Sequence, residues 1–147
     1  MGNEAAVFVV VDNDERNTED FKNELEEVAR NKVVTVDHVF CIAVEELEAW
    51  LLGDENAVKV AYPQVKTNVI HDYVQDSICG TWEILADAVY RGGSVKLKKE
   101  SRSYQDIGTV KCEWAKNIGE RLDIHNNQSP SFNYFIGEVE RRLSVTV

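Results

Sequence analysis

The fold is decided by one stretch of this sequence, Val7-Phe8-Val9-Val10-Val11-Asp12-Asn13-Asp14. Its run of apolar, mostly β-branched residues predicts a strand that is buried on both faces. Ligands of open α/β sheets bind at the carboxyl ends of the strands, so Asp12 and Asp14 are predicted to lie at that edge. Neighbouring carboxylates repel each other unless a cation lies between them, and Mg²⁺ prefers carboxylate oxygens. The stretch therefore predicts a divalent metal site, with a helix cap formed by Asp14 as the alternative.

The composition is that of one ordinary globular domain. The chain has 147 residues, of which 44% are hydrophobic, and this length is enough to bury an independent core. No apolar run approaches the roughly 20 residues that span a bilayer, and the first residues lack a secretion signal. The three cysteines are far apart and the three histidines have no zinc spacing, which argues against disulfides and zinc. We expect a cytoplasmic protein that does not bind membranes.

Charge is spread unevenly along the chain. Residues 1–55 contain 15 acidic and 4 basic residues, whereas residues 56–147 contain 11 acidic and 12 basic residues. The average field of such a chain does not attract nucleic acid. The segment 91–102 is locally basic, however, and its Lys96, Lys98 and Lys99 are candidates for contacts with phosphates. The alternative for this segment is a solvated, mobile loop.

The first part of the chain predicts a strand–helix–strand unit. Asn17 or Thr18 can cap a helix that extends to about Asn31, with Phe21, Leu25 and Val28 on its inner face. Residues 33–44 return to a pattern rich in Val, Ile and Phe. The simplest arrangement is a parallel pair of strands with a right-handed crossover.

The next segment, residues 45–52, predicts a helix that begins at the carboxyl end of the second strand. Leu47, Trp50 and Leu51 are expected to pack inward. Glu45 and Glu48 are three residues apart and would share one helical face. That face would lie near the edge that carries the two aspartates, unless both glutamates only face solvent.

The rest of the chain predicts further helices and no additional strand. Helical spacing of apolar residues is found in residues 54–61, 81–90, 111–122 and 131–143. We find no repeat, linker or low-complexity tract that would divide the chain. The prediction is a single α/β domain over residues 1–147, with a small parallel sheet flanked by helices and a helical C-terminal half.

Four segments together resemble a known family. Their order and spacing are similar to those of the Toprim-like family labelled "domain of unknown function 4276", which looks related to the nuclease half of the overcoming-lysogenization-defect proteins. The resemblance covers nearly the whole chain. The segments are Val9–Asp14, Val44–Leu52, Lys111–Ala115 and Asn127–Phe132.

The resemblance implies a Toprim fold in which acidic residues hold Mg²⁺ or Mn²⁺. By position, Asp12 and Asp14 match the metal-binding Asp-x-Asp pair. Glu45 and Glu48 match the acidic start of a helix and are expected to take part in catalysis, Glu48 also as a metal ligand. Lys111 matches a basic catalytic position that could neutralise charge on a phosphate. Ser129 and Ser131 match a Ser-Pro-Ser-Phe turn that would either face the substrate cleft or cap the last helix.

The function that the resemblance implies is metal-dependent cleavage of phosphodiester bonds in nucleic acid, with DNA expected in preference to RNA. A separately encoded ATPase partner, a role in defence against phage and a homo-oligomer are further expectations. The alternative is a non-catalytic subunit that docks on a partner protein through its acidic half and the exposed edge of its first strand.

One departure from the family pattern bears on activity. Toprim domains begin with a strand that ends in a catalytic Glu, whereas here the Asp-x-Asp strand starts at residue 7. We therefore expect a truncated form, a missing piece supplied by another polypeptide, or a loss of catalysis. A phosphatase of the haloacid dehalogenase type also places Asp-x-Asp after a strand, but its motif continues with Thr or Val where this chain has Glu15-Arg16.

Overall fold

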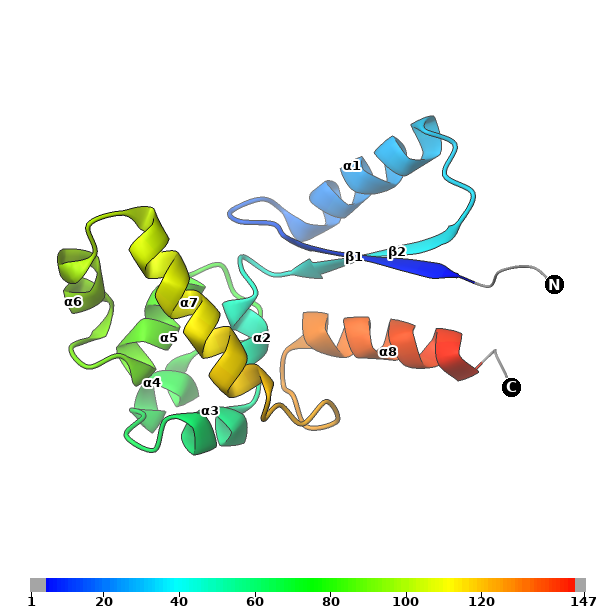
Figure 1. Ribbon diagram of the computed structural model, residues 1–147. Coiled ribbons are helices and arrows are strands. Elements are labelled where there is room, and N and C mark those ends of the chain that lie inside the picture. The colour runs from blue at the N-terminus through cyan, green and yellow to red at the C-terminus, as the bar shows by residue number, and fades with distance from the viewer. Residues whose placement is uncertain (1–4, 145–147) are drawn as a thin grey trace.

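The computed structural model describes residues 5–144, and its N-terminal part is a strand–helix–strand unit (Figure 1). The elements are β1 (Ala6–Asp12), α1 (Thr18–Asn31) and β2 (Asp37–Ala43). The two strands are parallel, and in their register Ala6 lies opposite Asp37 and Asp12 lies opposite Ala43. The predicted parallel pair is thus confirmed, and the carboxyl ends of both strands meet at one edge.

Helix α1 begins as the sequence predicts. The side chain of Asn17 accepts hydrogen bonds of 3.0 Å from the backbone N–H groups of Glu19 and Asp20, which satisfies donors that the first turn leaves free. Phe21 is buried against the sheet, but Val28, expected on the inner face, is 58% exposed. That part of the prediction is wrong, because Ala29 takes the inward position in the last turn.

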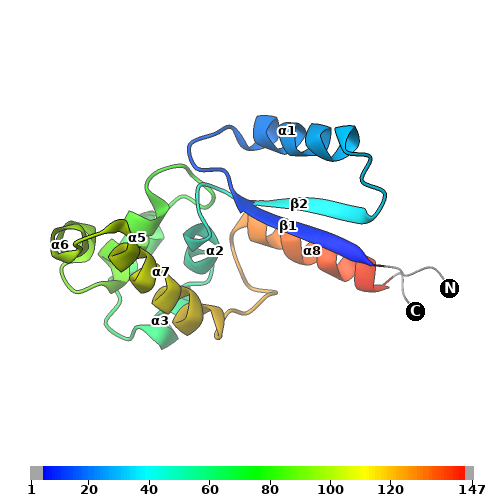
Figure 2. The ribbon, with the colours of Figure 1, turned by 45° about the horizontal axis from the view of Figure 1, so that its top comes forward.

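The chain then forms a group of helices and returns to the sheet. Among residues 5–144, α2 to α7 pack around a core of their own, and α8 lies on the face of the sheet opposite α1 (Figures 1 and 2). This arrangement confirms the α/β class, the small parallel sheet and the helical C-terminal part. The bounds are α2 Glu48–Leu52, α3 Glu55–Ala61, α4 Thr67–Asp72, α5 Thr81–Val89, α6 Gly93–Glu100, α7 Tyr104–Gly119 and α8 Pro130–Ser144.

Several boundaries differ from the sequence expectation. The strand predicted over residues 33–44 begins only at Asp37, because Val33 adopts a positive φ of 53° and turns the chain after α1. Helix α7 starts at Tyr104 rather than near Lys111, since Ser103 and Asp106 form a capping box there. Helix α4 was missed. The basic segment 91–102, which could have been a solvated loop, forms α6.

An aromatic cluster joins the two parts of the molecule. The ring of Trp50 on α2 stacks on Phe135 of α8 at a centroid distance of 5.3 Å and meets Phe132 edge-on at 5.5 Å. Phe135 in turn contacts Phe8 of β1 at 6.0 Å. Such pairs add to the free energy gained from burial alone. The cluster therefore fixes α8 between the sheet and α2.

The turn before α8 docks on the end of α2 at Gly53. A Cβ atom at Gly53 would lie 1.9 Å from the side-chain oxygen of Asn127, so a larger residue would displace that side chain. The side-chain nitrogen of Asn127 donates a hydrogen bond of 2.7 Å to the carbonyl oxygen of Trp50. This buried contact ties the start of α8 to the helix that follows β2.

The two strands differ in burial. Residues Val39–Ala43 of β2 are buried, as a strand covered on both faces requires, whereas Val7 and Val10 of β1 are 44% and 39% exposed. The prediction that β1 is buried on both faces is therefore wrong. Among residues 5–144 the sheet has only these two strands, so one edge of β1 has no neighbouring strand.

No helix within residues 5–144 combines the length and the apolar content that a membrane-spanning segment needs.

The aromatic cluster makes a testable contribution to stability. Phe132 is 5% exposed, so Phe132→Ala is expected to lower the free energy of unfolding by about 3–5 kcal/mol through lost burial and a new cavity. Urea denaturation followed by tryptophan fluorescence measures this change. Tyr104→Ala is the control, because Tyr104 is 77% exposed and its loss is expected to cost about 0.5 kcal/mol or less. Equal losses in both variants would contradict the assigned role of the cluster.

Candidate active site

The carboxyl ends of β1 and β2 are held together by Asn13, which is fully buried. The side-chain oxygen of Asn13 accepts a hydrogen bond of 2.6 Å from the backbone N–H of Glu45. The backbone N–H of Asp14 donates in turn to the carbonyl oxygen of Glu45 at 3.1 Å. These two bonds link the loop after β1 to the loop after β2. Sequence reasoning gave Asn13 no role, since asparagine is common in turns.

The backbone at this junction is unusual at two positions. Asp14 and Glu45 have positive φ angles of 51° and 64°, a left-handed conformation that aspartate tolerates and glutamate rarely adopts. With Glu45 in that conformation, helix α2 begins at Glu48 and not at residue 45. The prediction that Glu45 and Glu48 share one helical face is therefore wrong.

The carboxylate of Glu45 caps helix α5. It accepts hydrogen bonds from the backbone N–H groups of Gly80 at 2.8 Å and Thr81 at 2.6 Å, and from the Thr81 hydroxyl. Gly80 has no side chain with which to cap the helix, so Glu45 supplies the acceptor from a distant part of the chain. Burial by itself raises the pKa of Glu45, but these hydrogen bonds outweigh it and hold the pKa below its usual value. The structure gives Glu45 a structural role in this state.

Glu46 and Glu48, the next two glutamates after Glu45, both contact the ammonium group of Lys111. Lys111 on α7 donates a hydrogen bond of 2.9 Å to Glu46 and lies 3.3 Å from the carboxylate of Glu48. Burial would lower the pKa of Lys111, but the two glutamates outweigh burial and raise it. Glu48 is 5% exposed, and burial raises the pKa of its carboxyl group even though Lys111 opposes the change. Lys111 therefore neutralises protein carboxylates here.

Glu46 is the residue that sequence reasoning missed. It lies in the same run of glutamates as Glu45 and Glu48, which were the only two glutamates of that run predicted for the site. One of its carboxylate oxygens is buried and has no hydrogen-bond partner. The only available signal was the density of acidic residues in this run.

Asp12 completes the acidic cluster, which we define as Asp12, Glu46 and Glu48 around Lys111. The pKa of Asp12 is raised by burial and by the negative charges of Glu46 and Asp14, while Lys111 and a backbone hydrogen bond from Leu47 act in the opposite direction. Asp14 is exposed at the rim. The structure thus brings together Asp12, Glu48 and Lys111 of the predicted set, and turns the carboxylate of Glu45 toward α5.

Two hollows open beside the acidic cluster. One of about 440 Å³ is lined by Asp12, Glu48 and Lys111 and by apolar side chains that include Leu47. Leu47 is 46% exposed, so the expectation that it packs inward is wrong. A second hollow of about 280 Å³ is lined by five carboxylate residues together with Gly80 and Trp82: Asp14, Glu15, Glu45, Glu46 and Glu83. Solvent and small ligands can therefore reach the cluster.

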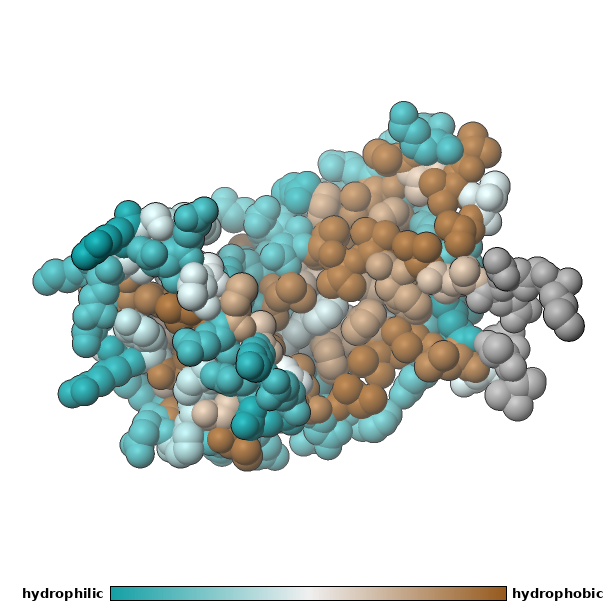
Figure 3. Space-filling model, in the orientation of Figure 1, coloured by the Kyte–Doolittle hydropathy of each residue, from teal (hydrophilic) through white to brown (hydrophobic). Residues whose placement is uncertain are grey.

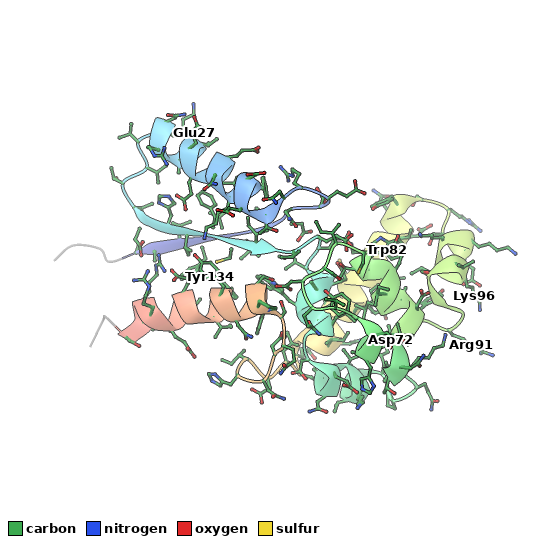
Figure 4. The ribbon with its side chains drawn as sticks, turned by 180° about the vertical axis from the view of Figure 1, so that it is seen from behind. Glu27, Asp72, Trp82, Arg91, Lys96 and Tyr134 are labelled. Carbon is green, nitrogen blue, oxygen red and sulfur yellow. The ribbon has the colours of Figure 1, made fainter. Side chains whose placement is uncertain are left out.

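The three candidate lysines of the basic segment lie on α6. Lys96 lies on α6 at the end of the molecule away from the sheet (Figure 4) and is 3.6 Å from Glu100. Lys98 forms an ion pair of 3.0 Å with Glu83 and lies 5.1 Å above the ring of Trp82. Lys99 is exposed on the same helix. The structure joins none of the three directly to the acidic cluster, although Lys98 reaches a wall of the second hollow.

Ser129 and Asp76 cap α8, and the Ser129 hydroxyl accepts a hydrogen bond of 3.2 Å from the backbone N–H of Phe132. Ser129 is fully buried, and its hydroxyl donates to Asp76 at 2.7 Å. The backbone N–H of Ser131 donates to the other oxygen of Asp76 at 2.6 Å, and the Ser131 hydroxyl accepts from the indole of Trp50 at 2.8 Å. The structure therefore supports the capping alternative for Ser129, whereas the Ser131 hydroxyl fixes the Trp50 indole against the start of the helix.

A preformed metal site is not present in the described part of the chain. Within residues 5–144, no group of three or more His, Cys, Asp or Glu side chains is arranged to hold a metal ion. In the acidic cluster the ammonium of Lys111 lies between Glu46 and Glu48 instead.

The capping role of Glu45 predicts a pH dependence. The pKa of Glu45 is lower in the folded chain than in the unfolded chain. Ionised Glu45 therefore stabilises the fold at every pH above the pKa of an unfolded glutamate, about 4.3. This contribution to stability is lost as the pH falls through the pKa that Glu45 has in the folded chain. Glu45→Gln is expected to cost about 1 kcal/mol at pH 7, and the difference from the wild type is expected to shrink below about pH 4. Urea denaturation across this pH range measures both effects.

Glu27→Gln is the matched control, because Glu27 is exposed on α1, remote from α5 (Figure 4). Its effect is expected to stay within about 0.5 kcal/mol at every pH. A cost for Glu45→Gln that does not change with pH would contradict the capping role.

Comparison with known proteins gives one result. A model of the family described as domain of unknown function (DUF4276) matches residues 2–140. No curated protein and no solved structure matches the chain. The match covers nearly the whole sequence, including every residue of the acidic cluster. The chain therefore belongs to the DUF4276 family.

Proposed function

We propose that this chain is a divalent-metal-dependent, nuclease-like domain whose acidic cluster binds Mg²⁺ or Mn²⁺. One observation carries the proposal. The carboxylates of Glu46 and Glu48 pair with the single ammonium of Lys111, and the third carboxylate, Asp12, lines the same hollow as Glu48 and Lys111. When all four groups are ionised, two negative charges stay uncompensated, and one divalent cation would neutralise them.

The donor groups fit such a cation. The cluster offers oxygen ligands only, which Mg²⁺ and Mn²⁺ prefer. Glu46 has a buried carboxylate oxygen without a hydrogen-bond partner, and the pKa of Asp12 is raised by burial and by neighbouring negative charge. Mg²⁺ keeps several waters and is commonly bound by only one or two carboxylates together with substrate phosphates. A ready-made site with three protein ligands is therefore not required.

Asp12 and Glu46 are the residues that would hold the cation, with Asp14 at the rim. Glu48, proposed as a ligand from the sequence, is almost fully buried beside Lys111 and instead helps to position that lysine. A bound divalent cation would supply positive charge for a phosphoryl oxygen and for an attacking water. Lys111 holds Glu46 in place and keeps the buried charge of Glu48 compensated.

The substrate and partner proposals rest on the family resemblance. Nucleic acid, DNA in preference to RNA, is the proposed substrate class, and an ATPase acting in phage defence is the proposed partner. Lys98 lies near the second hollow through its ion pair with Glu83. It is therefore the lysine of α6 best placed to contact a phosphate backbone.

Metal binding is expected to stabilise the fold. At a cation concentration about 100 times the dissociation constant, linkage contributes about 2.7 kcal/mol, which raises Tm by about 5 °C or more for a chain of this size. The double variant Asp12→Asn/Glu46→Gln is expected to lose this rise. Differential scanning calorimetry with Mg²⁺, Mn²⁺ or EDTA measures it, and cleavage of labelled DNA and RNA oligonucleotides in parallel tests the reaction.

The control is Glu27→Gln/Asp72→Asn, which removes the same charges at exposed positions far from the cluster (Figure 4). It is expected to keep the full rise in Tm. An unchanged Tm of the wild type in millimolar Mn²⁺ would rule out the metal site. A rise in Tm without cleavage of any oligonucleotide would support the site and reject the nuclease reaction for the chain acting alone.

Lys111 provides a second test. Lys111→Met removes the ammonium group that pairs with Glu46 and Glu48. Without metal, Tm is therefore expected to fall, and the free energy of unfolding to decrease by about 1–3 kcal/mol. The rise in Tm on adding Mn²⁺ is expected to exceed that of the wild type, because the cation no longer competes with an ammonium group for Glu46. A variant with no response to metal would contradict the view that Lys111 and the cation use the same carboxylates.

A non-catalytic docking subunit is the second candidate function. The observation that favours it is the open edge of β1, since an unpaired strand edge readily accepts another strand. This function does not require the acidic cluster to bind metal.

A further inference from the structure

The outer edge of β1 is unpaired throughout its length. Within residues 5–144, the backbone of Ala6–Val11 forms no hydrogen bond beyond its ladder with β2. The N–H and C=O groups that point away from β2 are therefore available to a further strand. Val7 and Val10 on this strand remain 44% and 39% exposed, although a run of this composition is typical of a fully buried strand.

Beside β2, at the other edge of the sheet, side chains of α1 and α8 come into contact. Lys22 of α1 donates a hydrogen bond of 3.0 Å to the hydroxyl of Tyr134 on α8. The two side chains line one hollow with Phe40 and Ile42 of β2, and Figure 4 shows Tyr134 on the side of α8 that faces the sheet. Side chains of α1 and α8 thus meet beside β2, which like β1 has no further strand at its outer edge within residues 5–144.

Apolar surface gathers around the open edge. Figure 3 shows hydrophobic side chains over β1 and over the adjoining parts of α1 and α8. Near the start of the sheet, the loop before β2 adds Val34 and Val36, which are 43% and 38% exposed. Contiguous apolar surface of this kind usually marks an interaction site.

We propose that a second copy of this chain pairs with the open edge, β1 against β1 in antiparallel orientation, to form a four-stranded sheet. The distribution of charge along β1 selects the antiparallel orientation for this pairing. The only charged residue of Ala6–Asp12 is Asp12, at one end of the strand. Antiparallel pairing places the two copies of Asp12 at opposite ends, whereas parallel pairing would bring them together. The pairing is symmetric, so it closes as a dimer.

The strand is complementary to itself in this arrangement. With the twofold axis at Val9, Val7 of each copy lies opposite Val11 of the other, and Phe8 lies opposite Val10. Apolar cross-strand pairs of this type stabilise a sheet. Because Phe8 packs on Phe135 of α8, the two α8 helices would cover one face of the sheet and the two α1 helices the other. Of the acidic cluster only Asp12 lies on the pairing strand, and the pairing uses backbone groups and not its carboxylate, so the dimer can be tested separately from metal binding.

The oligomeric state of residues 1–147 tests the proposal. Sedimentation velocity over a range of concentrations is expected to show a species of twice the chain mass of 16.7 kDa. The double variant Val7→Lys/Val10→Lys places two charges on the edge and is expected to raise the dissociation constant of the dimer about tenfold or more. The control Val74→Lys/Val95→Lys makes the same changes at positions that are 70% and 77% exposed on the helical part, and is expected to remain a dimer.

Hydrogen exchange of the wild-type chain gives a second measurement that needs no variant. The amides of Val7–Val11 that point away from β2 are expected to exchange more slowly as the protein concentration rises. A chain that stays monomeric at every concentration, with these amides equally fast throughout, overturns the proposal and leaves the edge to a strand of another protein. A dimer that the edge lysines do not weaken also overturns it.

Discussion

The structure depends on the contacts of one residue, Glu45. Its backbone N–H and carbonyl oxygen bond to Asn13 and Asp14 after β1, while its carboxylate caps α5 at Gly80 and Thr81. It therefore fixes the end of the sheet relative to the helical part. The positive φ of Glu45 carries a conformational cost that these bonds offset. The same conformation directs the following residues so that Glu46 and Glu48 reach Lys111.

The acidic cluster is the chemical consequence of that junction. A parallel pair of strands brings both carboxyl ends to one edge, and the chain places acids after each of them. Burial and mutual repulsion raise the pKa values of Asp12 and Glu48, so the folded chain maintains carboxylates under electrostatic strain. Lys111 relieves only part of it. Replacing buried charged groups by well-packed apolar residues is often neutral or stabilising, so the retained charge agrees with the ligand-binding role proposed above.

The sheet itself is incomplete by the usual standard of α/β proteins. A parallel sheet is normally covered by helices on both faces, and here residues Val39–Ala43 of β2 are buried while Val7 and Val10 of β1 stay exposed. The aromatic cluster around Trp50 holds α8 beneath the sheet, so the faces are largely closed. The open edge and the acidic cluster lie on the same strand but involve different groups, the outward amides in one case and Asp12 in the other.

The sequence by itself determined the strand–helix–strand unit, the cap at Asn17, the helical C-terminal part and the acidic character of the strand ends. These features follow from local periodicity, capping chemistry and charge, which neighbouring residues carry. Only the tertiary structure decided how the glutamates after β2 are used. A left-handed backbone at Glu45 turns its carboxylate toward α5, and Glu46 pairs with Lys111, 65 residues away. No local pattern encodes those contacts, because they arise when distant helices pack together.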